Sequence, residues 1–334
     1  VNTFCKVESV TEIDIANNIK SKTTQIIRSC INSNEMIGMF RQFADVVFTE
    51  DVVTNLPKAK YIQVEVEGTD AHKTVMDTVG NALRNASSSE KLKVYASVMT
   101  MATAAAANPK MLAGADSAYN PFKDYSVEEL DYENSKINKM CDITFDEYQK
   151  SNDIKGTQII FCDDGAGSGT VYSFNLHKDI KEKLIKRGIP EDEIVIVKSQ
   201  SDEKLEELFR QVNDGEVRVL IGTSAKMAEG LNVQERVVAI HHPTVTFSPA
   251  ALEQGNARGV RQGNINDEVR IYNYVQGDTY DAYKWQAQAR KGEMIKRALR
   301  GEAVSELEDV GGDIDPTDAM AVASGNPLVK DKID

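Results

Sequence analysis

Two arginines and a glutamine lie close together in LEQGNARGVRQGN, residues 252–264, and their types suit the binding of a phosphate group. A helix over residues 249–261 would place Gln254, Arg258 and Arg261 at positions i, i+4 and i+7, on one face. Guanidinium groups are planar, permanently charged and bidentate, so they match phosphate oxygens well. The alternative is a surface helix whose arginines form ion pairs with Glu253 or with the acidic C-terminal segment.

Two glycines in the same segment, Gly255 and Gly259, each cost a helix about 1 kcal/mol relative to alanine. A Gly-xxx-Gly spacing is expected where a helix backbone packs closely on another element. We therefore expect this segment to lie tightly against the body of the protein.

A second segment with polar residues after a buried strand is VLIGTSAKMAEGLNVQ, residues 219–234. Its apolar run ends at Gly222 and Thr223, and a short turn leads to Gly230 and Asn232. Ligands of open parallel sheets bind beyond the carboxyl ends of the strands. Thr223 and the loop after it thus lie where a ligand would be expected.

A glycine-rich loop follows the apolar run at residues 158–162, with Gly165, Gly167 and Gly169 in FCDDGAGSGT. Strand, glycine loop and helix is a common phosphate-binding arrangement. Here the spacing is GxGxG rather than GxGxxG, and no Gly-Lys dipeptide of a GxxxxGK[ST] loop occurs in the chain. We interpret this loop as an insertion, while a Rossmann-type enzyme that binds a dinucleotide or S-adenosylmethionine there stays an alternative.

The elements that would position these residues alternate regularly in the second half of the chain. Short apolar strands separated by helices are typical of a buried parallel sheet, so a doubly wound α/β domain is expected over about 140–300. Strands are predicted at 158–162, 193–197, 218–222, 236–241 and 269–275, and helices at 174–187, 202–213, 249–261 and 280–300. A strand at 61–68 and helices at 69–86, 88–107 and 135–151 precede them.

The 334-residue chain has an ordinary globular composition, with 41% hydrophobic and 27% charged residues. It contains no run of 18 apolar residues and no signal-peptide pattern, so we expect no membrane association and a cytoplasmic location. The four cysteines show no CxxC spacing and only four histidines accompany them, so no metal site is expected. The chain opens without methionine, which indicates a piece of a longer protein.

The net charge of −13 argues against strong autonomous binding to nucleic acid, but the charge is unevenly distributed. An acidic segment over 301–334 follows a basic helix that contains Lys291, Lys296 and Arg297. DNA contact through this helix therefore stays open, and a non-catalytic DNA-binding module is a further alternative.

Three segments of the chain resemble, in this order, motifs IV, V and VI of superfamily-two helicases: IIFCDD, VLIGTSAKMAEGLNVQ and EQGNARGVRQGN. The resemblance is closest to Swi/Snf-like and DEAD/DEAH-box helicases of phages and mobile elements, which are often fused to adenine-specific DNA methylase regions. Two positions depart from the pattern. Ala257 stands where motif VI has glycine, and Gly255 stands where the mobile-element proteins usually carry arginine.

The resemblance implies a RecA-like second helicase lobe in which Arg258 and Arg261 are arginine fingers and Gln254 helps to place them. Such fingers stabilise charge on the γ-phosphate of ATP. It also implies that Gly222, Thr223, Gly230 and Asn232 couple the nucleotide state to a DNA backbone, without reading sequence.

The same resemblance implies a division of labour between two lobes. ATP and Mg would be bound mainly by the N-terminal RecA-like lobe of the parent protein, so this chain alone would be inactive as an ATPase. The expected domains are a remnant or linker from the first lobe at 1–57, a mostly helical inter-lobe region at 58–140, the RecA-like domain at 141–300 and a flexible acidic tail at 301–334.

Overall fold

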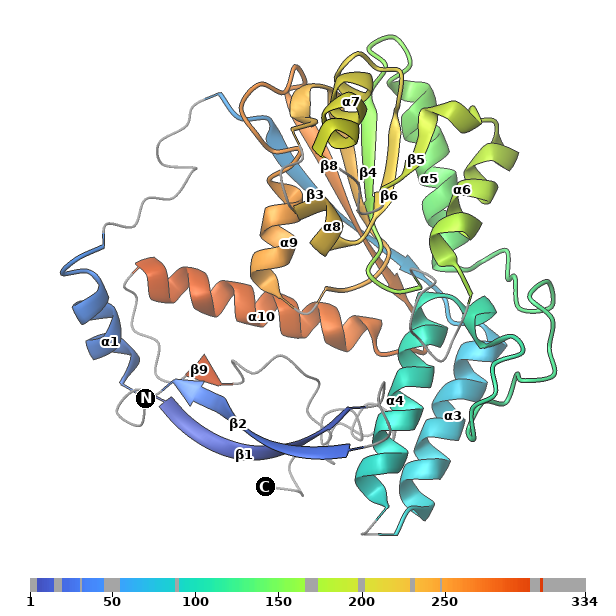
Figure 1. Ribbon diagram of the computed structural model, residues 1–334, viewed down its shortest axis with the longest axis vertical. Helices are drawn as coiled ribbons and strands as arrows, with labels where there is room; N and C mark the ends of the chain where they lie inside the picture. Colours follow the sequence, from blue (N-terminus) through green and yellow to red (C-terminus); the bar gives the residue numbers. More distant parts are fainter. Residues whose placement is uncertain are drawn as a thin grey trace.

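The computed structural model describes residues 5–14, 20–30, 32–44, 55–87, 90–165, 174–197, 202–228, 232–246, 248–300 and 307–308. Its body is a six-stranded sheet in the order β3-β8-β7-β4-β6-β5, and every neighbouring pair of strands is parallel (Figure 1). The strands are β3 (Lys58–Val66), β4 (Thr157–Phe161), β5 (Ile194–Ile196), β6 (Val219–Gly222), β7 (Val237–His242) and β8 (Glu268–Gln276).

The central strands β4, β6 and β7 are buried at every residue, because helices cover both faces of the sheet. Successive residues of a strand point to opposite faces, so Ile160 joins one hydrophobic core while Ile159 and Phe161 join the other. This arrangement confirms the predicted doubly wound α/β fold.

The first core is formed with α3 (Asp70–Asn85), α4 (Lys91–Ala107), α5 (Lys136–Lys150) and α6 (Leu176–Arg187). The second contains side chains of α7 (Asp202–Asn213) and α8 (Ser224–Ala228), with Val260 packed against it. Two further helices follow in the second half of the chain, α9 (Pro249–Asn256) and α10 (Asp281–Arg300). Short 3-10 turns span Pro109–Leu112, Glu191–Glu193 and Gln234–Arg236.

Several helix ends follow the local rules of the sequence. The Ser135 hydroxyl accepts a hydrogen bond from the Asn138 amide at the start of α5, and the Asn175 side chain accepts one from Lys178 at the start of α6. The α6 helix ends at Gly188, whose φ of 109° is in the left-handed region that glycine adopts readily. These boundaries lie within a few residues of those predicted.

One helix boundary was predicted wrongly. The α9 helix ends at Asn256, not at residue 261, so Arg258 and Arg261 lie on the turn after it and not on its face. After Asn256 the Arg258 and Gly259 amides donate to carbonyls three residues back, each over 3.1 Å, so the regular four-residue hydrogen-bond pattern of the α-helix is interrupted there.

The strand β3 belongs to the same sheet as the second half of the chain. It pairs with β8 in parallel from Lys58 opposite Glu268 to Val66 opposite Gln276. The sheet therefore incorporates a strand from the region that was expected to be mostly helical, 58–140. How the chain divides into independent domains stays a prediction.

The N-terminal region forms an antiparallel hairpin of β1 (Cys5–Asp14) and β2 (Lys20–Cys30), and β9 (Leu307–Glu308) adds to β2. The helix α1 (Ser33–Phe40) packs near α10, and the Arg41 guanidinium donates a hydrogen bond to the Leu299 carbonyl over 3.0 Å. Apart from β9, the tail at 301–334 lies outside the described residues. No helix in the described part of the chain combines the length and apolar character needed to cross a bilayer.

Candidate functional site

The α9 helix lies directly on the sheet. A Cβ atom on Gly255 would be 3.3 Å and 3.4 Å from ring atoms of Phe161, which leaves no room for a longer side chain without a shift. The buried His242 ring stacks on Phe161, and its Nε2 donates a hydrogen bond to Asn256 Oδ1 over 2.8 Å. Burial lowers the pKa of His242 to about 4, so the ring is neutral at pH 7. The close packing predicted from Gly255 is confirmed.

The turn at 257–264 is attached to the amino end of β7. A Cβ atom on Gly259 would lie 2.6 Å from Val237 Cγ1 and 3.1 Å from Ile240 Cδ1, so this position requires glycine. The side-chain Nδ2 of Asn264 donates hydrogen bonds to the backbone carbonyls of Val237 and Gly259, each over 2.9 Å. The backbone that carries both arginines is therefore held by the rigid sheet.

Arg258 is half-buried and Arg261 is exposed on this turn. Partial burial lowers the pKa of Arg258, and the positive charge of Arg261 lowers it further. Glu253, named as an alternative partner, forms no ion pair with Arg261. Gln254, exposed in the last turn of α9, completes a group of side chains whose charge and donors favour an anion.

The opposite edge of the sheet carries a second polar group, where three strands end. Asp163 follows β4, and its carboxylate accepts hydrogen bonds from the Ser224 amide over 2.6 Å and from the Ser224 hydroxyl over 2.9 Å. The Asp163 amide donates to the Thr244 hydroxyl over 3.0 Å. Thr223 Oγ1 accepts from the Lys226 amide over 3.3 Å at the start of α8. Asp163 thus joins the loops after β4, β6 and β7.

Sequence reasoning missed Asp163, Ser224 and Thr244 as a group. The signal that could have found them is a polar residue just beyond each of three buried strands, because parallel strands end at one edge. Gly222 is buried there, where a Cβ atom would be 3.1 Å from the Met227 side chain.

The predicted coupling residues are divided between the two edges. Thr223 lies at the carboxyl edge, whereas Asn232 lies toward the amino edge with Arg261, and its carbonyl accepts a hydrogen bond from Asn213 over 3.1 Å. The α8 and α9 helices pack against each other, so both segments are on one face of the sheet. Gly230 lies outside the described residues.

The two other sequence-derived sites are only partly described. Gly165 has a φ of 69°, and its carbonyl accepts a hydrogen bond from the Leu176 amide over 2.8 Å. Gly167 and Gly169 lie outside the described residues, so the interpretation of this loop as an insertion stays a prediction.

The basic residues proposed for DNA contact lie in the second half of α10. Lys291 and Lys296 are half-buried and Arg297 is exposed. Among the described side chains no cluster of three or more histidines, cysteines or carboxylates could hold a metal ion.

No family model matches the chain. Over 105 residues, 31% of the chain, it is 30% identical to the Defense against restriction protein B of Escherichia phage P1. That match spans only 5% of the phage protein.

Among solved structures, the C-terminal part of the Fun30 ATPase domain matches with a TM-score of 0.50 and 14% identity, over 84% of this chain and 99% of that chain. The Hef helicase domain of Pyrococcus furiosus matches with a TM-score of 0.44 and 18% identity, over 72% of this chain and 59% of that chain. The six parallel strands and the Fun30 comparison together show that the chain has a helicase-like, RecA-like α/β fold.

Proposed function

We propose that this chain is the C-terminal half of an ATP-dependent DNA helicase or translocase. In this proposal Arg258 and Arg261 act as arginine fingers on the γ-phosphate of ATP, and Gln254 helps to place them. The parent protein's N-terminal RecA-like lobe binds ATP and Mg, so the chain does not hydrolyse ATP alone. The proposal includes relationship to the Swi/Snf-like or DEAD/DEAH-box proteins of mobile elements and a cytoplasmic location.

The observation that carries the proposal is the turn after α9. Two guanidinium groups near enough for one to lower the pKa of the other lie on a backbone fixed by Gly259 and Asn264. Placing like charges together costs free energy, which an anion bound between them would offset. Preorganised cations of this kind stabilise charge that develops during phosphoryl transfer.

The donor set fits a nucleotide phosphate but not its metal ion. Guanidinium and amide groups donate hydrogen bonds to phosphate oxygens, whereas Mg²⁺ requires carboxylate or other oxygen ligands. No acidic cluster suited to a metal lies among the described residues. This difference supports the assignment of the metal to another lobe.

The carboxyl edge supplies the proposed contact with DNA. Asp163 holds the start of α8 through two hydrogen bonds, which positions the Thr223 loop at the place where ligands of parallel sheets bind. A hydroxyl and backbone amides can hold phosphates of DNA without reading its sequence. Because α8 packs on α9, a movement at one edge can reach the arginines at the other.

The test uses the intact protein that contains this chain, with Arg258→Ala, Arg261→Ala and the control Arg210→Ala. Arg210 is an exposed arginine that pairs with Glu207 and Asp214, so its loss should not affect hydrolysis. Each finger variant is expected to lose about 10³-fold or more in DNA-stimulated ATP hydrolysis, with ATP affinity nearly unchanged. Steady-state hydrolysis and equilibrium binding of ATP measure the two quantities separately.

Full hydrolysis by Arg258→Ala and Arg261→Ala would overturn the finger assignment. An equal loss of ATP affinity would make the arginines ground-state contacts instead. Turnover of ATP at motor-like rates by the 334-residue chain alone would contradict its dependence on another lobe.

A further inference from the structure

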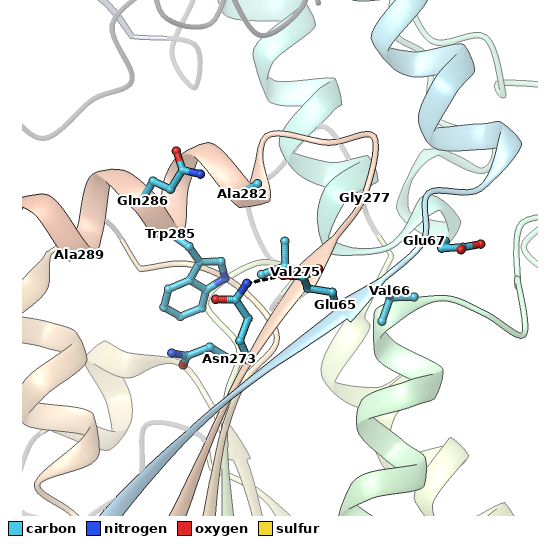
Figure 2. A pocket seen from close by; sticks show the side chains of 11 residues that line it. Glu65, Val66, Glu67, Asn273, Val275, Gly277, Ala282, Trp285, Gln286 and Ala289 are labelled. Carbon is cyan, nitrogen blue, oxygen red and sulfur yellow. Dashed lines mark hydrogen bonds between the residues drawn. The ribbon is translucent and has the colours of Figure 1, made fainter.

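A groove runs between the edge strand β3 and the helix α10, on the side of β3 away from its core-facing residues. Figure 2 shows α10 and β3 diverging from the turn at Gly277, with Trp285 directed from the helix toward the strands. Two cavities follow one another along this groove, an inner one of about 610 Å³ near Gly277 and an outer one of about 670 Å³. The α10 residues that line them recur every three or four positions: Ala282, Trp285, Gln286, Ala289, Gly292, Ile295, Lys296 and Leu299.

The inner cavity is rich in hydrogen-bond acceptors. Glu65 and Glu67 line it, and its lining contains no lysine, arginine or histidine. The Gln63 side chain donates one hydrogen bond to Glu65 Oε1 over 2.7 Å, which leaves the second oxygen of that carboxylate as an acceptor (Figure 2). The Asn273 side chain also lines the cavity, and its Oδ1 atom, which is buried from solvent, accepts no hydrogen bond from any described residue. These features favour a ligand group that carries positive charge and several donors.

Trp285 adds an aromatic surface to the same cavity. Its Nε1 donates a hydrogen bond to the Tyr274 carbonyl over 3.0 Å, which fixes the orientation of the half-buried ring. A cation over the face of an indole ring is attracted by the ring quadrupole. A guanidinium group stacks on such a face and has five donors and no acceptor, so it matches the acceptors around it.

The outer cavity is mainly apolar. Tyr61, Ile295 and Leu299 line it and are 63%, 48% and 37% exposed, respectively. Exposed large apolar side chains gathered in one place mark an interaction site more often than isolated ones do. The groove therefore offers apolar contacts at one end and recognition of a cation at the other.

We propose that this groove binds a polypeptide segment of a partner protein, with an arginine in the inner cavity and apolar side chains in the outer one. The groove is about 26 Å long on the strand side, from Ala59 to Glu67, enough for about eight extended residues. The acidic lining and the chain's net charge of −13 disfavour a nucleic acid, whose phosphates would be repelled. This proposal goes beyond the ATP and DNA roles proposed above, although the outer cavity borders the turn that carries the arginines at Val260 and shares Lys296 with the basic helix.

The chain contains one tryptophan, so the fluorescence of Trp285 reports directly on the inner cavity. The complete 334-residue chain is titrated with two capped peptides, Arg-Ala-Leu-Leu and Leu-Leu-Ala-Arg, and with counterparts in which uncharged citrulline replaces arginine. We expect a saturable change with at least one arginine peptide and about tenfold weaker binding of its citrulline counterpart.

Variants test the two cavities separately. The double change Glu65→Gln and Glu67→Gln should weaken the arginine peptide about tenfold, whereas Glu128→Gln with Glu206→Gln alters the net charge equally and should not. Ile295→Ser should weaken the peptide but not capped arginine alone, because only the peptide reaches the outer cavity. Melting temperatures of all variants check that the fold is retained.

Three results would overturn the proposal. If the citrulline peptide binds as tightly as the arginine peptide, the inner cavity does not recognise a cation. If capped arginine alone binds as tightly as the arginine peptide, the groove does not bind a polypeptide segment. A fluorescence change with a short oligothymidine, but with neither arginine peptide, would assign the groove to nucleic acid instead.

Discussion

Charged groups in the body of the protein and those on the turn after α9 are arranged in opposite ways. In the body, Lys136 and Asp281, both almost fully buried, form an ion pair of 2.5 Å. The Lys110 ammonium contacts Asp179 at 2.6 Å and Asp131 at 3.0 Å. Burial acts to lower the pKa of Lys110, but hydrogen bonds and charges from these carboxylates raise it above its ordinary value.

On the turn, burial lowers the pKa of Arg258, and the charge of a second cation, Arg261, lowers it further. The paired charges connect elements far apart in the chain, because Asp281 begins α10 and Lys136 begins α5. A buried pair of opposite charges is thus part of the fold, whereas like charges on a fixed turn are suited to binding an anion.

The largest expected effect comes from breaking the buried pair. Lys136→Met leaves the Asp281 carboxylate buried without its cation and should lower the free energy of unfolding by about 3–5 kcal/mol. Urea denaturation measures the change. Lys178→Met, in the exposed pair with Glu182, should cost less than about 0.5 kcal/mol, and similar losses in both variants would contradict the comparison.

Gly259→Ala tests the attachment of the turn to the sheet. The added Cβ would meet Val237 and Ile240, so unfolding should become easier by about 1–3 kcal/mol. Gly292→Ala in α10 meets only the Pro249 Cβ at 3.9 Å and should stabilise by up to about 1 kcal/mol. An unchanged or raised stability of Gly259→Ala would show that the turn is not held as described.

The buried histidines should make the body sensitive to acid. Burial lowers the pKa of His72 from its ordinary value of 6.5 to about 4. Because the unfolded chain then binds more protons, the stability due to neutral His72 is present above pH 6.5 and is lost as the pH falls toward 4. Between pH 6.5 and 5.5 this loss is about 1 kcal/mol. In His72→Gln, the free energy of unfolding measured by urea denaturation should depend less steeply on pH between 6.5 and 5.5. The same dependence on pH in both proteins would contradict this assignment to His72.

The smallest expected effect on stability belongs to the exposed arginine of the turn. Arg261→Met should change the free energy of unfolding by less than about 0.5 kcal/mol, because substitutions of exposed side chains usually have small effects. The same urea curves check this. A loss above about 2 kcal/mol would show that the arginine stabilises the fold through an ion pair, as Lys136 does.

Predictions from the sequence were best where local rules apply. The strands and most helices were found because apolar runs and capping residues such as Ser135 and Asn175 are read within a few positions. The close packing at Gly255 and Gly259 was also predicted, since glycine is costly in a helix without such a reason. The end of α9 was missed because the backbone changes to hydrogen bonds three residues back after Asn256, and the spacing of Gln254, Arg258 and Arg261 did not indicate this change.

The sequence by itself determined the doubly wound class of the fold and the identity of the cationic segment, because hydrophobic periodicity and residue type are local properties. Only the tertiary structure decided that β3 pairs with β8, more than 200 residues away, and that this edge strand forms an acidic groove with α10. It also decided that Lys136 forms an ion pair with Asp281, and that Arg261 lies near enough to Arg258 for its charge to lower the pKa of that residue. Strand pairing and charge pairing depend on how the elements close in space, which no local pattern specifies.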